Sequence, residues 1–224
     1  MTGKNKKSVL NVNYLRAYVG MGLLIGVLGA GHGQSMSDSL FVASTVSAAP
    51  ALLLAKELPA HVRVADYLIS EKYDGVRAFW DGRVLRFRGG GVVAAPEWFT
   101  RALPAEALDG ELWLGRGQFE VTSGIVRQRT PNDADWRRVK YMVFELPNAA
   151  GSFEQRVQRV ERIVLDARNP QLVAVRQFRL SDRSQLQHQL DEVIRGGGEG
   201  LMLHLASAVY ETGRSDVLYK LKPL

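Results

Sequence analysis

Short stretches of alternating or continuous apolar residues recur from about residue 51 onward, and they predict β-strands. Asp81 and Gly82 separate two such runs, which predicts a β-hairpin over 76–88. The run over 140–146 is apolar enough for a strand that is buried on both faces. Further strands are predicted over 64–72, 107–115, 117–126, 199–205 and 216–222. Strands in hairpins with a few helices between them predict an α+β fold built on antiparallel sheets.

Two segments instead repeat apolar residues with the period of an α-helix. The first begins with a capping box over 152–155 and carries an apolar face over 157–164. The second is predicted to begin near Ser181 and to end at Gly196, because glycine favours the end of a helix. A short helix or turn is predicted at 96–99.

The first 49 residues differ from the rest of the chain. Basic residues precede a mostly apolar run at 17–31, and the small residues at 46–48 resemble a signal peptidase site. The apolar run is short for a spanning helix, which needs about 20 residues. The pattern favours a secretory leader over 1–49, hence a periplasmic protein with no stable membrane association after cleavage. A membrane anchor stays open, as does a start codon misassigned upstream of Met21 or Met36, which would leave the protein cytoplasmic.

The composition is that of an ordinary globular protein, with 46% hydrophobic and 23% charged residues. A net charge of +6 and a pI near 9.7 suit a polyanionic partner, because clustered lysine and arginine attract phosphates. Charge alone does not establish nucleic-acid binding. The sequence has no cysteine, which excludes disulfides, thiolate catalysis and cysteine-ligated zinc.

Lys72 lies in the stretch EKYDGVR (71–77), at the end of a predicted strand and just before an Asp-Gly turn. A lysine attacks a phosphorus or carbonyl centre only as the neutral amine, which burial or a nearby cation such as Arg77 would favour. Taken alone, the pattern fits a surface lysine at a strand end equally well.

Two further acid-glycine pairs and two lysines change that balance. Asp109-Gly110, which Glu111 follows, and Glu199-Gly200 are each predicted to form a turn that leads into a strand. Lys220 and Lys222 fall on one face of a strand, because side chains repeat every two residues. Paired lysines repel each other and predict an anionic ligand such as a triphosphate, and the acids could hold a divalent cation. With Lys72 they predict a phosphoryl-transfer site. Taken singly, each of these residues has a structural alternative. Glu111 and Glu199 could be solvent-facing residues at strand ends, and Lys220 and Lys222 could protect an edge strand from pairing with another chain.

Six motifs in this order resemble those of the covalent nucleotidyltransferases, and most closely the ATP-dependent DNA ligases of the small bacterial type that carries a secretion signal. They are EKYDGVR (71–77), FRGGG (87–91), LDGELW (108–113), YMVFELP (141–147), EGLMLH (199–204) and YKLKP (219–223). The resemblance runs from about Pro50 to Pro223. It implies an ATP-grasp-like nucleotidyltransferase domain over 50–224, with two antiparallel β-sheets flanked by helices.

The resemblance implies roles in binding and activating ATP. Lys72 would attack the α-phosphate of ATP to form lysyl-AMP and release pyrophosphate. Arg77 and Glu111 would hold the ribose, and Phe144 would stack on the adenine. Many relatives have glutamate two residues before the nucleophile, where this chain has Ser70. We therefore expect adenine selectivity to depend on backbone groups and Phe144.

The resemblance also implies the groups that meet phosphates, metal and DNA. Lys220 and Lys222 would hold the α-phosphate, and Glu199 would bind Mg²⁺ or Mn²⁺. Arg88 would meet the ribose or the 5′-phosphate at a nick in duplex DNA, and the protein is expected to act as a monomer. His204 stands where many relatives carry lysine, and it receives no catalytic role.

The sequence departs from the family at its end. DNA ligases follow the last motif with an OB-fold, and this sequence ends at Leu224. We therefore expect an adenylation domain without its OB-fold, from a fragment, a truncated gene or a protein whose barrel is supplied separately. Weak or no self-adenylation is expected, because domain closure would not complete the site. A non-catalytic nucleic-acid-binding remnant stays open, as does an RNA ligase or capping-type nucleotidyltransferase.

Overall fold

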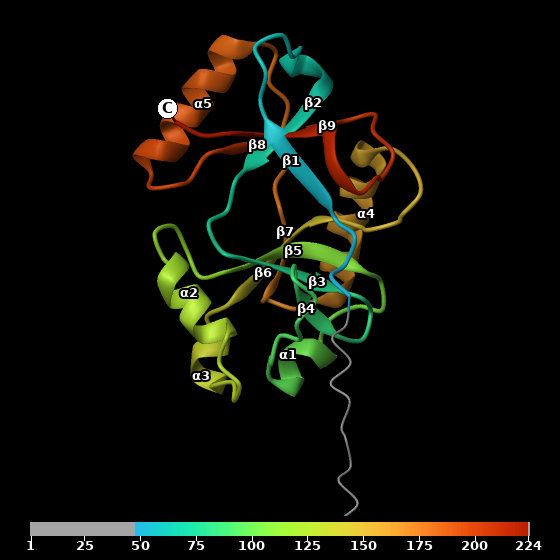
Figure 1. Cartoon of the computed structure of the whole chain (residues 1–224), viewed down its shortest axis with the longest axis vertical. Helices are drawn as coiled ribbons and strands as arrows, with labels where there is room; N and C mark the ends of the chain where they lie inside the picture. The colour runs from blue at the N-terminus through green and yellow to red at the C-terminus, as the bar shows by residue number, and fades with distance from the viewer. Residues whose placement is uncertain (1–47, 224) are drawn as a thin grey trace, which may run out of the picture. The chain divides into compact units, whose positions relative to one another are not determined.

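The computed structural model describes residues 48–223, whose strands form two separate sheets (Figure 1). The strands are β1 (Leu53–Glu57), β2 (Tyr67–Glu71), β3 (Val76–Trp80), β4 (Leu85–Phe87), β5 (Leu108–Trp113), β6 (Lys140–Glu145), β7 (Leu172–Ala174), β8 (Leu201–Leu205) and β9 (Gly213–Leu221). The helices are α1 (Glu97–Arg101), α2 (Phe119–Val126), α3 (Asp133–Trp136), α4 (Phe153–Ala167) and α5 (Arg183–Arg195), with a 3-10 turn η1 (Val64–Asp66). This arrangement confirms the α+β prediction of two sheets flanked by helices.

The four-stranded sheet has the order β1-β9-β8-β2. Strand β8 pairs antiparallel with both of its neighbours, whereas β1 joins β9 in parallel at the edge. One face of this sheet packs against helix α5, whose Leu186, Leu190 and Val193 belong to the same core as Ile69 and Leu203. The opposite face is left to line a cavity.

The five-stranded sheet has the order β4-β3-β5-β6-β7. Its inner pairs are antiparallel, and β7 joins β6 in parallel at the edge. The predicted hairpin at Asp81 and Gly82 is confirmed as the β3–β4 connection. The core below this sheet includes Trp136 from α3 and Val160 from α4, both buried. Each sheet thus has its own core.

The prediction of a strand over 117–126 is wrong, because this segment forms helix α2. Its β-branched residues favoured a strand, but three buried side chains lie at helical spacing, Thr122, Ile125 and Val126. Burial of that stripe outweighs a propensity difference of less than about 1 kcal/mol per residue. The other predicted strands are confirmed within a few residues, except that 64–66 forms η1.

The predicted helix ends are confirmed by their caps. Ser152 and Gln155 make both hydrogen bonds of a capping box at the start of α4. Helix α5 begins after Asp182, whose carboxylate accepts from the Gln185 amide at 2.9 Å, and ends before Gly196. Each cap satisfies backbone groups that a helix end leaves without partners.

No helix within residues 48–223 combines the length and the apolar character needed to cross a membrane. The leader predicted over 1–49 lies, apart from residues 48 and 49, outside the described residues and stays a prediction.

Candidate active site

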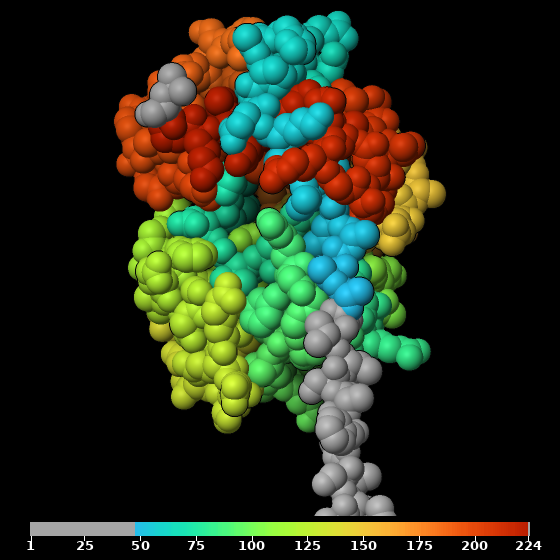
Figure 2. Space-filling model, in the orientation of Figure 1, coloured from blue at the N-terminus to red at the C-terminus, as the bar shows by residue number. Residues whose placement is uncertain are grey.

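A cavity of about 380 Å³ is lined by residues of both sheets. Figure 2 shows the surface hollowed between the C-terminal strands, in red, and the green segment below them. The predicted site residues that line this cavity are Lys72, Arg77, Arg88, Glu111, Phe144, Lys220 and Lys222. Glu199 lines an adjoining hollow that shares Lys72 with the cavity. The fold therefore gathers residues from six separate motifs into one place.

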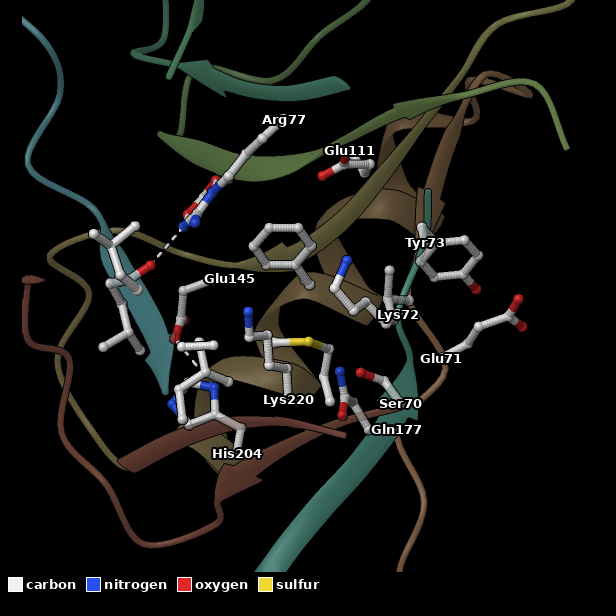
Figure 3. A pocket seen from close by; sticks show the side chains of 18 of the residues that line it. Ser70, Glu71, Lys72, Tyr73, Arg77, Glu111, Glu145, Gln177, His204 and Lys220 are labelled. Carbon is white, nitrogen blue, oxygen red and sulfur yellow. Dashed lines mark hydrogen bonds and ion pairs between the residues drawn. The ribbon is translucent and has the colours of Figure 1, made fainter. Parts of the chain in front are cut away.

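Lys72 follows directly after β2, and its backbone amide donates to the Gly200 carbonyl at 2.9 Å. The chain then passes close to β5 at Gly75, where an added Cβ would lie 2.3 Å from the Leu112 carbonyl oxygen. Glycine is needed here because any side chain would collide with β5. A left-handed backbone is not the reason, since the φ of Gly75 does not lie in that region. Figure 3 shows the amines of Lys72 and Lys220 directed toward the same space.

Glu199 joins two of the predicted lysines. Its carboxylate forms ion pairs with both Lys72 and Lys222. The Lys72 and Glu199 side chains are only 22% and 21% exposed, so water screens their pair incompletely. Partial burial disfavours the charged carboxylate, but hydrogen bonds from Lys222 and Lys72 outweigh it and lower the pKa of Glu199. Glu199 is thus held as a carboxylate next to the candidate nucleophile.

Arg77 and Glu111 lie opposite each other on β3 and β5. The Arg77 guanidinium nevertheless points to Asp109, donating from Nε at 3.0 Å and from Nη2 at 2.6 Å. It also donates to the Leu53 carbonyl at 2.8 Å. Burial raises the pKa of Glu111 to about 8, against the opposing effects of Arg77 and Lys72. At neutral pH the Glu111 carboxyl group can therefore donate a hydrogen bond.

The remaining predicted residues occupy the other walls of the cavity. The Phe144 ring lies 5.5 Å from the Arg77 guanidinium carbon, measured to the ring centre. Lys220 forms an ion pair with Glu57 at 2.8 Å. Arg88 follows β4 and is exposed at the edge of the cavity. An aromatic face, a cation and an exposed arginine can accommodate a base, a phosphate and a second anionic group.

His204 also lines the cavity, but its surroundings are those of a core residue. Its ring stacks on Phe153 with centroids 3.6 Å apart. Burial, and secondarily the charge of Arg156, lowers the pKa of His204 to about 3, so the ring is neutral.

Sequence reasoning missed the carboxylates that hold the predicted cations. Asp109 pairs with Arg77, and Glu57 pairs with Lys220. Asp109 lies inside one of the six motifs, but the turn predicted at Asp109-Gly110 is wrong, because both residues lie within β5. Glu57 had no signal in the sequence, because β1 meets β9 only in the folded sheet.

The donor set around Glu199 fits one kind of metal ion. Among the described residues no three histidine, cysteine, aspartate or glutamate side chains gather to form a protein-only cage. Magnesium commonly keeps several water ligands and binds through one or two carboxylates together with substrate phosphates. Glu199 fits that mode, because it lies beside a cavity large enough to admit phosphate groups.

A family model, a related protein and a solved structure all indicate the same family. The family model described as "ATP dependent DNA ligase domain" matches residues 92–222. A DNA ligase of Haemophilus influenzae is 31% identical over 82% of this chain and 68% of its own length. A Lig E DNA ligase, solved in a structure-function study of DNA binding with a minimal scaffold, is 42% identical. It covers 78% of this chain and 69% of its own, with a TM-score of 0.74.

A more distant structure shares the fold. The Chlorella virus DNA ligase-adenylate is 20% identical, with a TM-score of 0.66 over 78% of this chain and 69% of its own. Two sheets that enclose the lysine-bearing cavity, the ordered motifs and these relatives together identify the chain. It belongs to the ATP-dependent DNA ligase family and carries that family's nucleotidyltransferase (adenylation) domain.

Proposed function

We propose that Lys72 is the residue that becomes adenylated, and that ATP occupies the cavity between the two sheets. The observation that carries this proposal is the gathering of Lys72, Lys220, Phe144 and Glu111 on one cavity of about 380 Å³. That volume lies at the lower end of the range for small-molecule sites. Phe144 stacks on the adenine, and Arg77 and Glu111 hold the ribose.

Formation of lysyl-AMP needs a free amine on Lys72. The Lys72 ammonium leaves its ion pair with Glu199 and releases one proton to water, and the neutral amine nitrogen then attacks the α-phosphorus of ATP. The new P–N bond forms as the bond to the β-phosphate bridging oxygen breaks, and pyrophosphate leaves. Lys220 and Lys222 balance the negative charge that develops on the α-phosphate oxygens. A divalent cation, when bound near Glu199, supplies further charge neutralisation.

The adenylate then passes to DNA. An oxygen of the 5′-phosphate at a nick attacks the phosphorus of lysyl-AMP, which returns Lys72 to the free amine. The 3′-hydroxyl next attacks that 5′-phosphate, a phosphodiester bond forms and AMP leaves. Arg88, exposed at the edge of the cavity, meets the incoming 5′-phosphate. The net charge of +6 supports a polyanionic substrate such as nicked duplex DNA.

The test is labelling with α-³²P-ATP and magnesium, using the chain alone and with a ligase OB-fold supplied separately. With the OB-fold present, we expect an acid-labile label on the parent that Lys72→Ala abolishes. Lys140→Ala is the matched control, since Lys140 bonds the Pro170 carbonyl outside the cavity. A label that survives Lys72→Ala, or none even with the barrel, would contradict the proposal.

The polynucleotide substrate is tested separately. We expect the labelled protein to transfer AMP to nicked DNA in preference to nicked RNA, and not to transfer a nucleotide to RNA 5′ ends. Preference for nicked RNA would instead favour the RNA ligase alternative. Retention of DNA without any transfer would favour a nucleic-acid-binding remnant.

We also propose that residues 1–49 direct export to the periplasm. The basic residues followed by an apolar run and a small-residue site support this. Sequencing the N-terminus of protein recovered from the periplasm should give a start near residue 49. An intact N-terminus in cytoplasmic protein would contradict it.

A further inference from the structure

Gln177 carries a buried acceptor that the protein does not use. It lies between β7 and α5, and its Oε1 is buried without a hydrogen-bond donor among the described residues. The same side chain lines the cavity between the sheets. Buried acceptors in native proteins are nearly always paired, so an unpaired one facing a cavity points to a group that enters from outside.

The backbone fixes where Gln177 sits. The next residue, Phe178, exchanges two hydrogen bonds with Ile69, at 2.8 and 2.9 Å. In an antiparallel bridge the following position on one strand faces the preceding position on the other, so Gln177 lies opposite Ser70. Figure 3 shows these two side chains next to each other at the wall of the cavity. Their placement depends on main-chain pairing and not on a flexible loop.

The same row continues across the four-stranded sheet. Ser70 pairs with Met202 on β8, and Met202 pairs with Lys220 on β9. All of these side chains line the cavity, and in order they are a carboxamide, a hydroxyl, a thioether and an ammonium. The row is therefore cationic at one end and neutral but polar at the other. A nucleotide has the matching polarity, because its phosphates are anionic and its base edge is neutral.

With the phosphates at Lys220, the base reaches toward the other end of the row. We infer that Gln177, supported by its neighbour Ser70, recognises the amino edge of the purine. Gln177 Oε1 accepts a hydrogen bond from the 6-amino group, and Nε2 donates to ring nitrogen N1. A carboxamide presents an acceptor beside a donor, which is the complement of the donor and acceptor on adenine. This inference rests on the proposed binding of ATP in the cavity.

The assignment gives this chain a side chain for base selectivity in addition to Phe144 and backbone groups. Phe144 supplies a flat apolar face that any base could use, so stacking alone selects weakly. A site that hydrogen-bonds a particular N–H group discriminates strongly against analogues that lack it. Gln177 is therefore the specificity-determining position of the cavity.

The test compares two nucleotides by equilibrium binding in the presence of magnesium. One is ATP, and the other is purine riboside 5′-triphosphate, which has hydrogen in place of the 6-amino group. We expect the parent to bind ATP about tenfold more tightly than the analogue. Gln177→Leu should weaken ATP binding about tenfold more than it weakens binding of the analogue, which keeps N1 but lacks the 6-amino group, so that the preference disappears.

Gln128→Leu is the matched control, because Gln128 is exposed and lies outside the cavity, and it should keep the parent preference. Thermal unfolding checks that Gln177→Leu is folded, and Gln177→Met replaces it if it is not. Equal weakening of both nucleotides, or a preference that survives in the variant, would overturn the inference and leave ATP binding intact. A parent that binds neither nucleotide would overturn the proposed function as well.

Discussion

Lys72 is ion-paired with Glu199, a residue 127 positions further along the chain. Glu199 at the same time pairs with Lys222, so one carboxylate holds two cations of the candidate site. On the proposed mechanism, the Lys72 side chain must leave this ion pair before its nitrogen can attack. Glu199 thus positions Lys72 at rest, and the proposal also makes it the residue nearest the metal.

We predict that Glu199→Gln slows lysyl-AMP formation about 100-fold, the size of effect seen when a charge-stabilising group is removed. The affinity for ATP should change little, since Phe144 and Lys220 are intact. Single-turnover labelling and nucleotide titration measure the two quantities. Glu192→Gln, on the exposed side of α5, should leave both unchanged. An unaltered labelling rate in Glu199→Gln would contradict this prediction.

Glu111 should make the folding stability depend on pH. Burial raises its pKa from 4.5 to about 8, so the folded protein binds more protons than the unfolded chain between these values. The free energy of unfolding therefore falls as the pH rises from about 4.5 to about 8. Glu111→Gln should remove that loss and gain stability over the parent at pH 8, on the order of 2 kcal/mol.

Urea unfolding of the parent and of Glu111→Gln at pH 5 and pH 8 measures this effect. The exposed Glu106 provides the control, and Glu106→Gln should follow the parent at both pH values. A difference between Glu111→Gln and the parent that is the same at both pH values would show that Glu111 is ionised throughout.

The buried pair between Glu145 and Arg156 should be important for stability. Arg156 donates to both carboxylate oxygens, at 2.7 and 2.8 Å, and to the carbonyls of Gly151 and Ala208. Both side chains are almost completely buried, so Arg156→Met would leave the Glu145 carboxylate without its partner. We predict a loss of about 3–5 kcal/mol in the free energy of unfolding.

Denaturant titration measures this loss, with the exposed Arg162→Met as control on the same helix. The double variant Glu145→Gln with Arg156→Met should lose less than the sum of the two single variants, because the residues are in contact. Strict additivity would mean that the two side chains do not interact in solution.

Gly75 should tolerate no side chain. A Cβ there would lie 2.3 Å from the Leu112 carbonyl oxygen, which belongs to the backbone of β5 and cannot turn away. We predict that Gly75→Ala lowers stability by about 1–3 kcal/mol and displaces Lys72 enough to slow its labelling. Gly89→Ala is the control, since nothing lies within 4 Å of its added Cβ. Equal melting temperatures for the two variants would show that β5 can move.

Local patterns predicted much of this fold, because caps, hairpin turns and apolar runs act over a few residues. The capping box at Ser152 and the hairpin at Gly82 are of this kind. Helix α2 could not be predicted in the same way, because the burial of Ile125 and Val126 depends on their packing partners. The parallel pairing of the edge strands also could not be predicted from the sequence, because no local signal joins β1 to β9.

The residues of the candidate site likewise include some that local motifs predict and one that only long-range contacts place. Lys72, Arg77, Glu111 and Phe144 were found because their motifs occur in a recognisable order, and the structure gathers them on one cavity. Gln177 belongs to no recognised motif. Its backbone neighbour Phe178 meets Ile69 more than one hundred residues away in sequence, so only the folded sheet reveals its position.

The parallel pairing of β1 with β9 has a consequence for how the protein is made. Lys56 on β1 bonds Asp216 on β9 across a separation of 160 residues, so the first described strand meets the last. Ribosomes extend a chain from its N-terminus, and contacts between distant segments form slowly. The sheet that carries Lys220 therefore closes only after synthesis has passed Leu221. Until then the nascent chain lacks the wall that β9 gives to the cavity between the sheets.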